Sequence, residues 1–214
     1  MEALRMTGAP AIERNPVRDY RLVIFDMDGT LTEELLDFTA IRREVGVSDG
    51  VGLLEHMANL SGPSRTRAHD ILHRHEMSAA ESCVLHAGAH EVLAALAERG
   101  IHRALLTRNS AACARRVIER HALVLDHIST REDLPHKPHG DSILNIVRRF
   151  GALVEQTLMV GDYLYDLQAA HAAGTDSALL WMKPEAPPDF AAMATYTLSG
   201  LQDVLALVSN RSPR

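Results

Sequence analysis

The sequence contains only two cysteines, only two lysines and no long hydrophobic run, and these shortages exclude several classes of protein. Cys83 and Cys113 are too few for a disulfide framework and have no metal-ligand spacing, so we expect reduced, buried thiols and a cytoplasmic location. No apolar stretch is long enough to span a bilayer, and the N-terminus lacks the hydrophobic core of a signal peptide. A net charge of -6 argues against a nucleic-acid-binding surface, which needs clustered positive charge. The sequence therefore predicts neither a membrane nor a nucleic acid as a partner.

The pattern of apolar and turn-forming residues divides the chain into an arm, a core and a helical insertion. Residues 1–18 show no periodicity, and we expect a flexible N-terminal arm. Residues 35–85 contain helix and turn signals only, with a break at residues 61–64, which predicts a small all-helical cap domain. Strands alternate with helices in residues 19–34 and 86–214, which predicts an α/β core with a Rossmann-like, doubly wound parallel sheet. We expect strands near residues 22–26, 103–107, 126–129, 157–160, 177–181 and 196–198.

The first predicted strand ends in two carboxylates, Asp26 and Asp28. On an extended chain these side chains lie on the same side and repel each other unless a cation or a shared proton lies between them. A hard divalent cation such as Mg²⁺ is the simplest remedy, because it binds one or two carboxylates and leaves a carboxylate available as a nucleophile. For this short string alone, a strand followed by an Asp-Gly turn is the alternative interpretation.

Three later segments place polar residues at or just after predicted strands. The second strand ends in Thr107, before a helix whose N-terminal amides can hold phosphate. A later loop contains Lys137, and a compact ammonium suits a site that must neutralise both a phosphate oxygen and a crowded carboxylate. The fourth strand runs into Asp162, with Asp166 one helical turn further on. Because the carboxyl ends of parallel strands meet at one edge, we expect these residues to converge on one crevice.

The string Asp26-Met27-Asp28-Gly29-Thr30-Leu31 resembles the first motif of the haloacid dehalogenase superfamily, and the three later segments match its other motifs in order. The resemblance covers roughly residues 21–181 and points to the phosphoglycolate phosphatase-like branch with a small helical cap. It implies that Asp26 attacks phosphorus and that Asp28 is the general acid and base. It also implies that Asp166 contacts the metal through water or supports its ligands, and that Asp166 orients Lys137. It also implies that Mg²⁺ is bound by Asp26, the backbone carbonyl of Asp28 and Asp162. The expected catalytic residues are Asp26, Asp28, Thr107 and Lys137, and the expected phosphate-binding residues are Gly29, Thr30, Thr107, Arg108, Asn109 and Lys137.

These roles predict a Mg²⁺-dependent phosphatase that hydrolyses a small phosphorylated metabolite through an aspartyl phosphate. Asp28 argues against a dehalogenase, because a halide leaves without a proton, and the absence of lysine between Glu34 and Leu85 argues against a phosphonate hydrolase of this group. Two alternatives stay open: a sugar phosphomutase similar to beta-phosphoglucomutase, and a catalytically silent binding protein with the same fold. A mutase could grip a second anionic group with a cationic stretch of the cap, namely Arg65, Arg67, His69, His73 and His75. The sequence leaves the physiological substrate open, and it fits a monomer and a homodimer equally.

Overall fold

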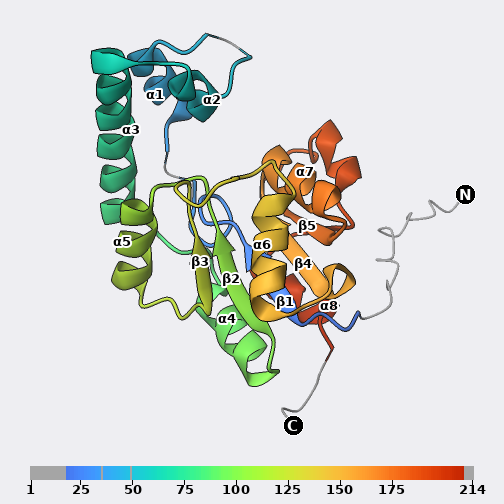
Figure 1. The fold of residues 1–214 in the computed structure, drawn as a ribbon. Helices are drawn as coiled ribbons and strands as arrows, with labels where there is room; N and C mark the ends of the chain where they lie inside the picture. Colours follow the sequence, from blue (N-terminus) through green and yellow to red (C-terminus); the bar gives the residue numbers. More distant parts are fainter. Residues whose placement is uncertain (1–17, 35, 49, 210–214) are drawn as a thin grey trace, which may run out of the picture.

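The structure is a computed structural model that describes residues 18–34, 36–48 and 50–209 (Figure 1). The predicted N-terminal arm lies outside the described residues except for Arg18, which forms an ion pair with Asp176 at 3.2 Å. None of the helices in the described ranges is both long and apolar enough to cross a membrane. Both cysteines are buried and free, as the sequence predicts.

Six parallel strands form one sheet in the order β3-β2-β1-β4-β5-β6, which confirms the predicted doubly wound α/β fold. The strands are β1 (Leu22–Phe25), β2 (His102–Leu106), β3 (His127–Ser129), β4 (Thr157–Gly161), β5 (Asp176–Leu180) and β6 (Tyr196–Leu198). The four central strands, β2, β1, β4 and β5, are short and almost entirely buried, as expected for strands covered on both faces, whereas the edge strands β3 and β6 each bury only their last residue. The chain runs outward from β1 through β2 to β3 and then crosses to the other side of β1 at β4, so the switch point where such sheets bind ligands lies between β1 and β4.

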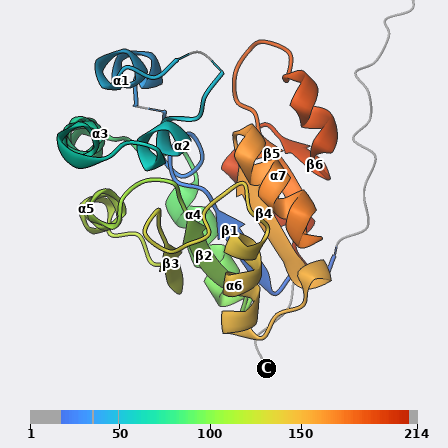
Figure 2. The ribbon, with the colours of Figure 1, turned by 45° about the horizontal axis from the view of Figure 1, so that its top comes forward.

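Helices cover both faces of the sheet (Figure 2). Alternate residues of β1 point in opposite directions, so Val23 and Phe25 pack into one apolar cluster while Leu22 and Ile24 pack into another. The first cluster is completed by α4 (Ala89–Glu98), α5 (Ala111–His121) and α8 (Val204–Leu207), and the second by α6 (Asp141–Phe150) and α7 (Leu164–Ala173). A short 3-10 turn, η3 (Leu201–Asp203), leads directly into α8. The remaining 3-10 turns are η1 (Val154–Gln156) and η2 (Asp189–Met193).

The helical insertion stands over the carboxyl ends of the strands (Figure 1). It consists of α1 (Phe38–Val45), α2 (Leu53–Ala58) and α3 (Gly62–Ser82). These helices share an apolar cluster of their own, made of Leu36, Ile41, Leu53, Met57, Ala68 and Leu72. On this ground we propose that residues 35–85 form the cap domain and that residues 19–34 and 86–214 form the core.

The longest cap helix, α3, begins earlier than the sequence predicts. Residues 61–64 read as a break because they contain Gly62 and Pro63, but the helix starts at Gly62. Proline is tolerated in the first turn of a helix, since the amide that it lacks has no partner within the helix there. The C-terminal part of α3 lies against α5, so this helix joins the cap to the core.

Candidate active site

Three carboxylates meet at the carboxyl edge of the sheet. β1 and β4 are neighbours in register, with Phe25 opposite Val160, so the residues that follow these strands lie close together. Asp26 follows β1, Asp162 follows β4 and Asp166 lies in the first turn of α7. One oxygen from each of these three carboxylates lies within 4.8 Å of the others. The predicted convergence of the first and fourth motifs is therefore present in the structure.

Lys137 binds two of these carboxylates. Its Nζ donates to Oδ1 of Asp26 at 2.6 Å and to Oδ1 of Asp166 at 2.6 Å, and the residue is only 2% exposed. Burial by itself would lower the pKa of this ammonium, but the two adjacent carboxylates raise it above its usual value. Lys137 is thus a fixed positive charge, and it holds the Asp26 side chain in place, as the sequence predicts for a residue of the third motif.

The negative charge of the cluster exceeds what one lysine can offset. Burial and the neighbouring charges of Asp26 and Asp166 raise the pKa of Asp162 to about 8. Burial also raises the pKa of Asp166 to about 6, although Lys137 acts in the opposite direction. Buried carboxylates that resist ionisation form a donor set suited to a hard divalent cation, which binds oxygen ligands and replaces the proton. The side chains therefore fit Mg²⁺, with Asp26 and Asp162 as ligands.

The raised pKa of Asp162 predicts that the metal-free protein loses stability as the pH rises. The folded chain binds this proton more tightly than the unfolded chain, so the stabilising contribution is full below the usual pKa of 3.8 and is lost as the pH rises through about 8. Asp166 acts in the same direction up to about pH 6. In chelator, we expect the melting temperature to fall between pH 6 and pH 9, and Mg²⁺ to raise it more at the higher pH. The Asp162→Asn protein is the control, because it lacks the titrating group. If the melting temperature of the unchanged protein in chelator does not fall over this interval, the raised pKa assigned to Asp162 is contradicted.

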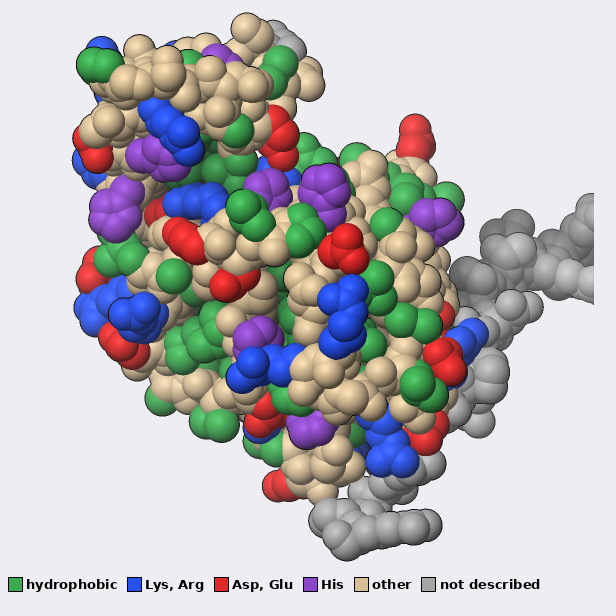
Figure 3. Space-filling view, in the orientation of Figure 1, with side chains coloured by type: hydrophobic (Ala, Val, Ile, Leu, Met, Phe, Trp, Pro, Cys, Tyr) green, Lys and Arg blue, Asp and Glu red, His purple; other side chains and the backbone are tan. Residues whose placement is uncertain are grey.

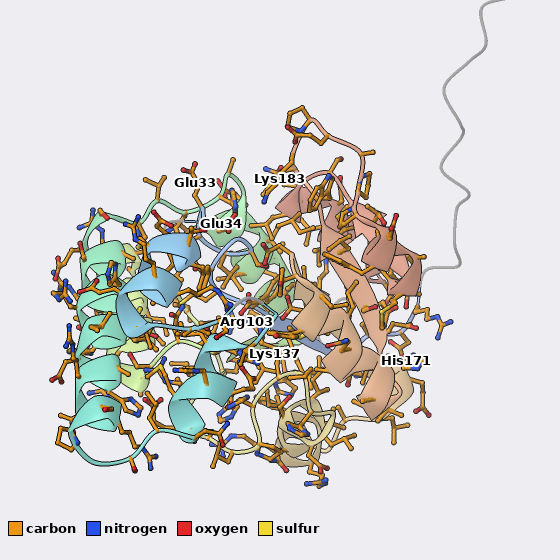
Figure 4. The ribbon with its side chains drawn as sticks, turned by 90° about the horizontal axis from the view of Figure 1, so that it is seen from above. Glu33, Glu34, Arg103, Lys137, His171 and Lys183 are labelled. Carbon is orange, nitrogen blue, oxygen red and sulfur yellow. The ribbon has the colours of Figure 1, made fainter. Side chains whose placement is uncertain are left out.

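A cavity of about 680 Å³ lies between the cap and the cluster. Eight predicted site residues line it: Asp26, Asp28, Thr107, Arg108, Asn109, Lys137, Asp162 and Asp166. At its rim Glu34, on the segment leading into the cap, pairs with Lys183 of the loop after β5 at 3.2 Å. Figure 4 shows these two side chains together at one rim, with Lys137 nearer the centre of the molecule. The cavity thus brings all four predicted motifs to one space.

Comparison with known proteins places this chain in a family. Residues 20–174 match the family model described as haloacid dehalogenase-like hydrolase. The chain belongs to this family. It is 29% identical over 194 residues to a haloacid dehalogenase-like hydrolase domain-containing protein from Arabidopsis thaliana, covering 85% of this chain and 77% of the relative. It is 26% identical over 181 residues to a phosphoglycolate phosphatase from Pseudomonas putida, covering 72% of this chain and 66% of the relative.

A solved structure confirms the fold of this hydrolase. The crystal structure of a hydrolase from Pseudomonas syringae superposes with a TM-score of 0.71, at 19% identity, over 86% of this chain and 96% of that chain. At this level of identity the likeness supports the fold alone. The predicted membership of the haloacid dehalogenase superfamily is therefore confirmed by the family model, and the architecture by the structure.

Gly29 and Thr30 of the first motif contact Asp162 in this hydrolase, and neither lines the cavity. Gly29 has a φ of 84°, and a Cβ at this position would collide with the Asp162 carboxylate. The Thr30 hydroxyl lies 3.5 Å from Oδ1 of Asp162. The amide of Gly29 donates to the carbonyl of Thr32, and that of Thr30 to the carbonyl of Met27. Their predicted role in binding phosphate stays untested, and the structure shows both residues supporting Asp162.

The second motif contributes a hydroxyl to the cavity, and three amides at or near the start of its helix have acceptors within the protein. Thr107 is buried, and its Oγ1 accepts a hydrogen bond from the amide of Asn109 at 3.1 Å. At the start of α5, the amide of Ala111 donates to Glu132 at 2.9 Å, and the amide of Cys113 donates to Ser110 at 3.3 Å. Each of these three amides has an acceptor within the protein, so binding phosphate through one of them would replace an existing hydrogen bond. Their role in holding phosphate stays a prediction, and the buried Thr107 hydroxyl lines the cavity directly.

The cationic stretch of the cap does not reach the cavity. Arg65, Arg67, His69 and His73 are exposed on α3 and line no part of it, and His75 pairs with Glu44 at 2.9 Å. The structure instead places an ion pair at the cavity wall that sequence reasoning missed, between the buried Glu76 and the partly buried Arg131. Arg131 contacts both carboxylate oxygens of Glu76, at 2.5 and 3.2 Å, and Ser110 donates to Glu76 at 2.7 Å. No sequence signal identifies this pair, because its members come from α3 and from the loop after β3.

Proposed function

We propose that this protein is a Mg²⁺-dependent phosphatase that hydrolyses a small phosphomonoester through an aspartyl phosphate on Asp26. The supporting observation is the Asp26 carboxylate, fixed by Lys137 at 2.6 Å inside an acidic cluster at the base of a cavity. A carboxylate held in this way is a nucleophile with a defined position. Membership of the haloacid dehalogenase-like hydrolases supports the same reaction class.

In the first half of the proposed reaction, an oxygen of Asp26 attacks phosphorus. The bond between phosphorus and the ester oxygen breaks, and Asp28 gives a proton to the leaving alcohol. In the second half, Asp28 takes a proton from a water molecule, which attacks phosphorus and breaks its bond to Asp26. Phosphate leaves, and Asp26 returns to its starting state. Lys137 and the Thr107 hydroxyl stabilise the charge that gathers on the phosphoryl oxygens.

Asp26, Asp162 and the backbone carbonyl of Asp28 are the proposed ligands of Mg²⁺. When bound, the cation offsets the repulsion between the phosphate and the carboxylates. Asp166 is not needed as a direct ligand, because its carboxylate accepts from Lys137 and from the amide of Tyr163 at 3.1 Å. Asp166 therefore positions Lys137 and the start of α7.

Neither alternative function gains support from the geometry. The cap residues expected to grip the second anionic group of a mutase substrate do not line the cavity. A silent binding protein would have no need of the acid, the nucleophile and the lysine that line the same cavity here. The likeness to a phosphoglycolate phosphatase makes phosphoglycolate one candidate substrate.

Phosphate release from a panel of phosphomonoesters tests the proposal. The panel contains phosphoglycolate, sugar phosphates, nucleotides and simple alkyl phosphates, each assayed with Mg²⁺ and with chelator. We expect release that depends on Mg²⁺ from at least one ester. Phosphate release that continues unchanged in chelator would contradict the proposed function. The same holds if folded protein that binds Mg²⁺ releases phosphate from no ester of the panel.

A further inference from the structure

The cap lines the cavity largely with apolar side chains, although Arg42 and Glu76 also reach it. Six side chains from the cap line it: Leu36, Phe38, Val51, Leu53, Leu54 and Leu72. Leu36, Leu53 and Leu72 are buried, whereas Phe38 is 45% and Val51 40% exposed at the edge. In Figure 3 the cap overhangs the body of the molecule, and hydrophobic side chains show in the recess beneath it. The polar reaction centre therefore opens into an apolar space.

The arginines that line this cavity are already bound to other groups. Arg108 donates to Glu55 of α2 at 2.7 Å and to the carbonyl of Lys137 at 2.6 Å. Arg131 is paired with Glu76. Arg42 donates to two carbonyl oxygens of the following loop, both at 2.6 Å. The carboxylates of Glu55 and Glu76 offset the charges of Arg108 and Arg131, which leaves less positive charge here for a carboxylate or a second phosphate of a substrate.

The core side of the cavity adds an aromatic surface. Tyr163 and Tyr165 both line it and make an edge-to-face contact, with ring centroids 5.3 Å apart. Tyr163 also makes an edge-to-face contact with Phe190 of η2 at 6.1 Å. The guanidinium of Arg108 lies 4.5 Å from the centre of the Tyr165 ring, which fixes that ring at the boundary with the polar part. Aromatic walls of this kind favour flat or apolar groups over hydroxyl-rich ones.

The volume also bears on the size of the ligand. A cavity of about 680 Å³ lies within the range of roughly 300–1,000 Å³ that is usual for sites of drug-sized molecules. The phosphate and the cation occupy the acidic base, and the apolar part is left for the leaving group. A leaving group as small and charged as glycolate would leave this apolar part unfilled.

We propose that the substrate is a phosphomonoester whose leaving group carries an apolar alkyl or aryl portion, bound between the cap leucines with Phe38 and the tyrosines of the core. This inference rests on the proposed phosphatase activity, and it adds the chemical class of the substrate. The apolar portion leaves water on binding, and this burial supplies binding energy that hydrophilic leaving groups cannot supply at these walls.

A series of straight-chain alkyl phosphates tests this inference, because the esters differ in apolar length and share the same bond to be broken. Ethyl, butyl and hexyl phosphate are compared with glycerol phosphate and phosphoglycolate, all with Mg²⁺. We expect kcat/KM to rise by about two- to fourfold for each added methylene. Hexyl phosphate is expected to exceed both hydrophilic esters.

Variants of the apolar wall show whether this cavity causes the dependence of kcat/KM on alkyl chain length. Phe38→Ser and Val51→Ser are expected to reduce the ratio of kcat/KM between hexyl and ethyl phosphate, whereas Phe38→Leu retains it. Val124→Ser is the control, because Val124 is 65% exposed and does not line the cavity; its ratio is expected to match the unchanged protein.

The outcomes separate the two proposals. If the protein releases phosphate with Mg²⁺ but kcat/KM does not depend on chain length, the inference about the substrate is overturned. The same holds if phosphoglycolate or glycerol phosphate is preferred. In both cases the proposed phosphatase activity is unaffected. An unchanged ratio in both serine variants overturns the assignment to this cavity. Absence of release from every ester overturns the proposed function, and the substrate class with it.

Discussion

Replacing Asp26 by asparagine is expected to abolish phosphate release, whereas replacing Asp28 by asparagine is expected to reduce it. An amide at position 26 cannot attack phosphorus, so no covalent intermediate forms. Asp28 supplies proton transfer, and loss of a general acid or base costs about 10²- to 10⁴-fold in rate. Both variants keep the shape of the side chain, which makes their fold comparable with that of the unchanged protein.

Steady-state assays with Mg²⁺ and the best ester of the panel measure this difference. Asp70→Asn is a suitable control, because Asp70 is an exposed carboxylate on α3 outside the cavity. Its rate is expected to equal that of the unchanged protein. Equal residual activity in the Asp26 and Asp28 variants would contradict the roles assigned to them.

Replacing Lys137 by methionine is expected to destabilise the metal-free protein strongly and to remove activity. The change leaves Asp26 and Asp166 buried without their shared ammonium. Removal of one partner of a buried ion pair typically costs about 3–5 kcal/mol. Activity is lost as well, because the nucleophile is no longer held and the phosphoryl charge loses a partner. Lys137→Arg is not expected to restore activity, since a planar guanidinium does not fit the space of a compact ammonium.

The chain contains a matched control for this experiment. Lys183 is its other lysine, and it forms an exposed ion pair with Glu34 at 3.2 Å, with 54% of its side chain accessible. Exposed pairs contribute about 0–1 kcal/mol, so Lys183→Met is expected to change the free energy of unfolding little. Urea unfolding in chelator compares the two variants. Equal free energies of unfolding for both would show that the buried network does not stabilise the fold in the way described.

The sequence predicts the reaction centre well because its residues follow strands. Asp26 and Asp162 each come directly after a buried apolar run. Parallel strands bring such residues to one edge of the sheet, independently of the conformation of the loops. Lys137 stands out because lysine is so rare in this chain. The architecture follows from the same alternation of strands and helices.

The contacts between the cap and the core could not be predicted in this way. The pairs Glu55–Arg108 and Glu76–Arg131 join residues 53 and 55 positions apart, and they depend on how α2 and α3 are oriented over the sheet. No local pattern encodes that orientation. The need for glycine at position 29 could not be predicted for a similar reason: Asp162, whose space Gly29 preserves, follows another strand.

The most direct test of the account is to trap the covalent intermediate and identify the residue that carries it. Asp28→Asn protein is mixed with acetyl phosphate and Mg²⁺, because this leaving group needs no proton while hydrolysis of the intermediate is slowed. Borohydride then reduces an aspartyl phosphate to homoserine, and mass spectrometry locates the change in the sequence. We expect homoserine at position 26, and none after the same treatment of a protein that also carries Asp26→Asn. Homoserine at another position, or an unmodified Asp26 during continuing phosphate release, would contradict it.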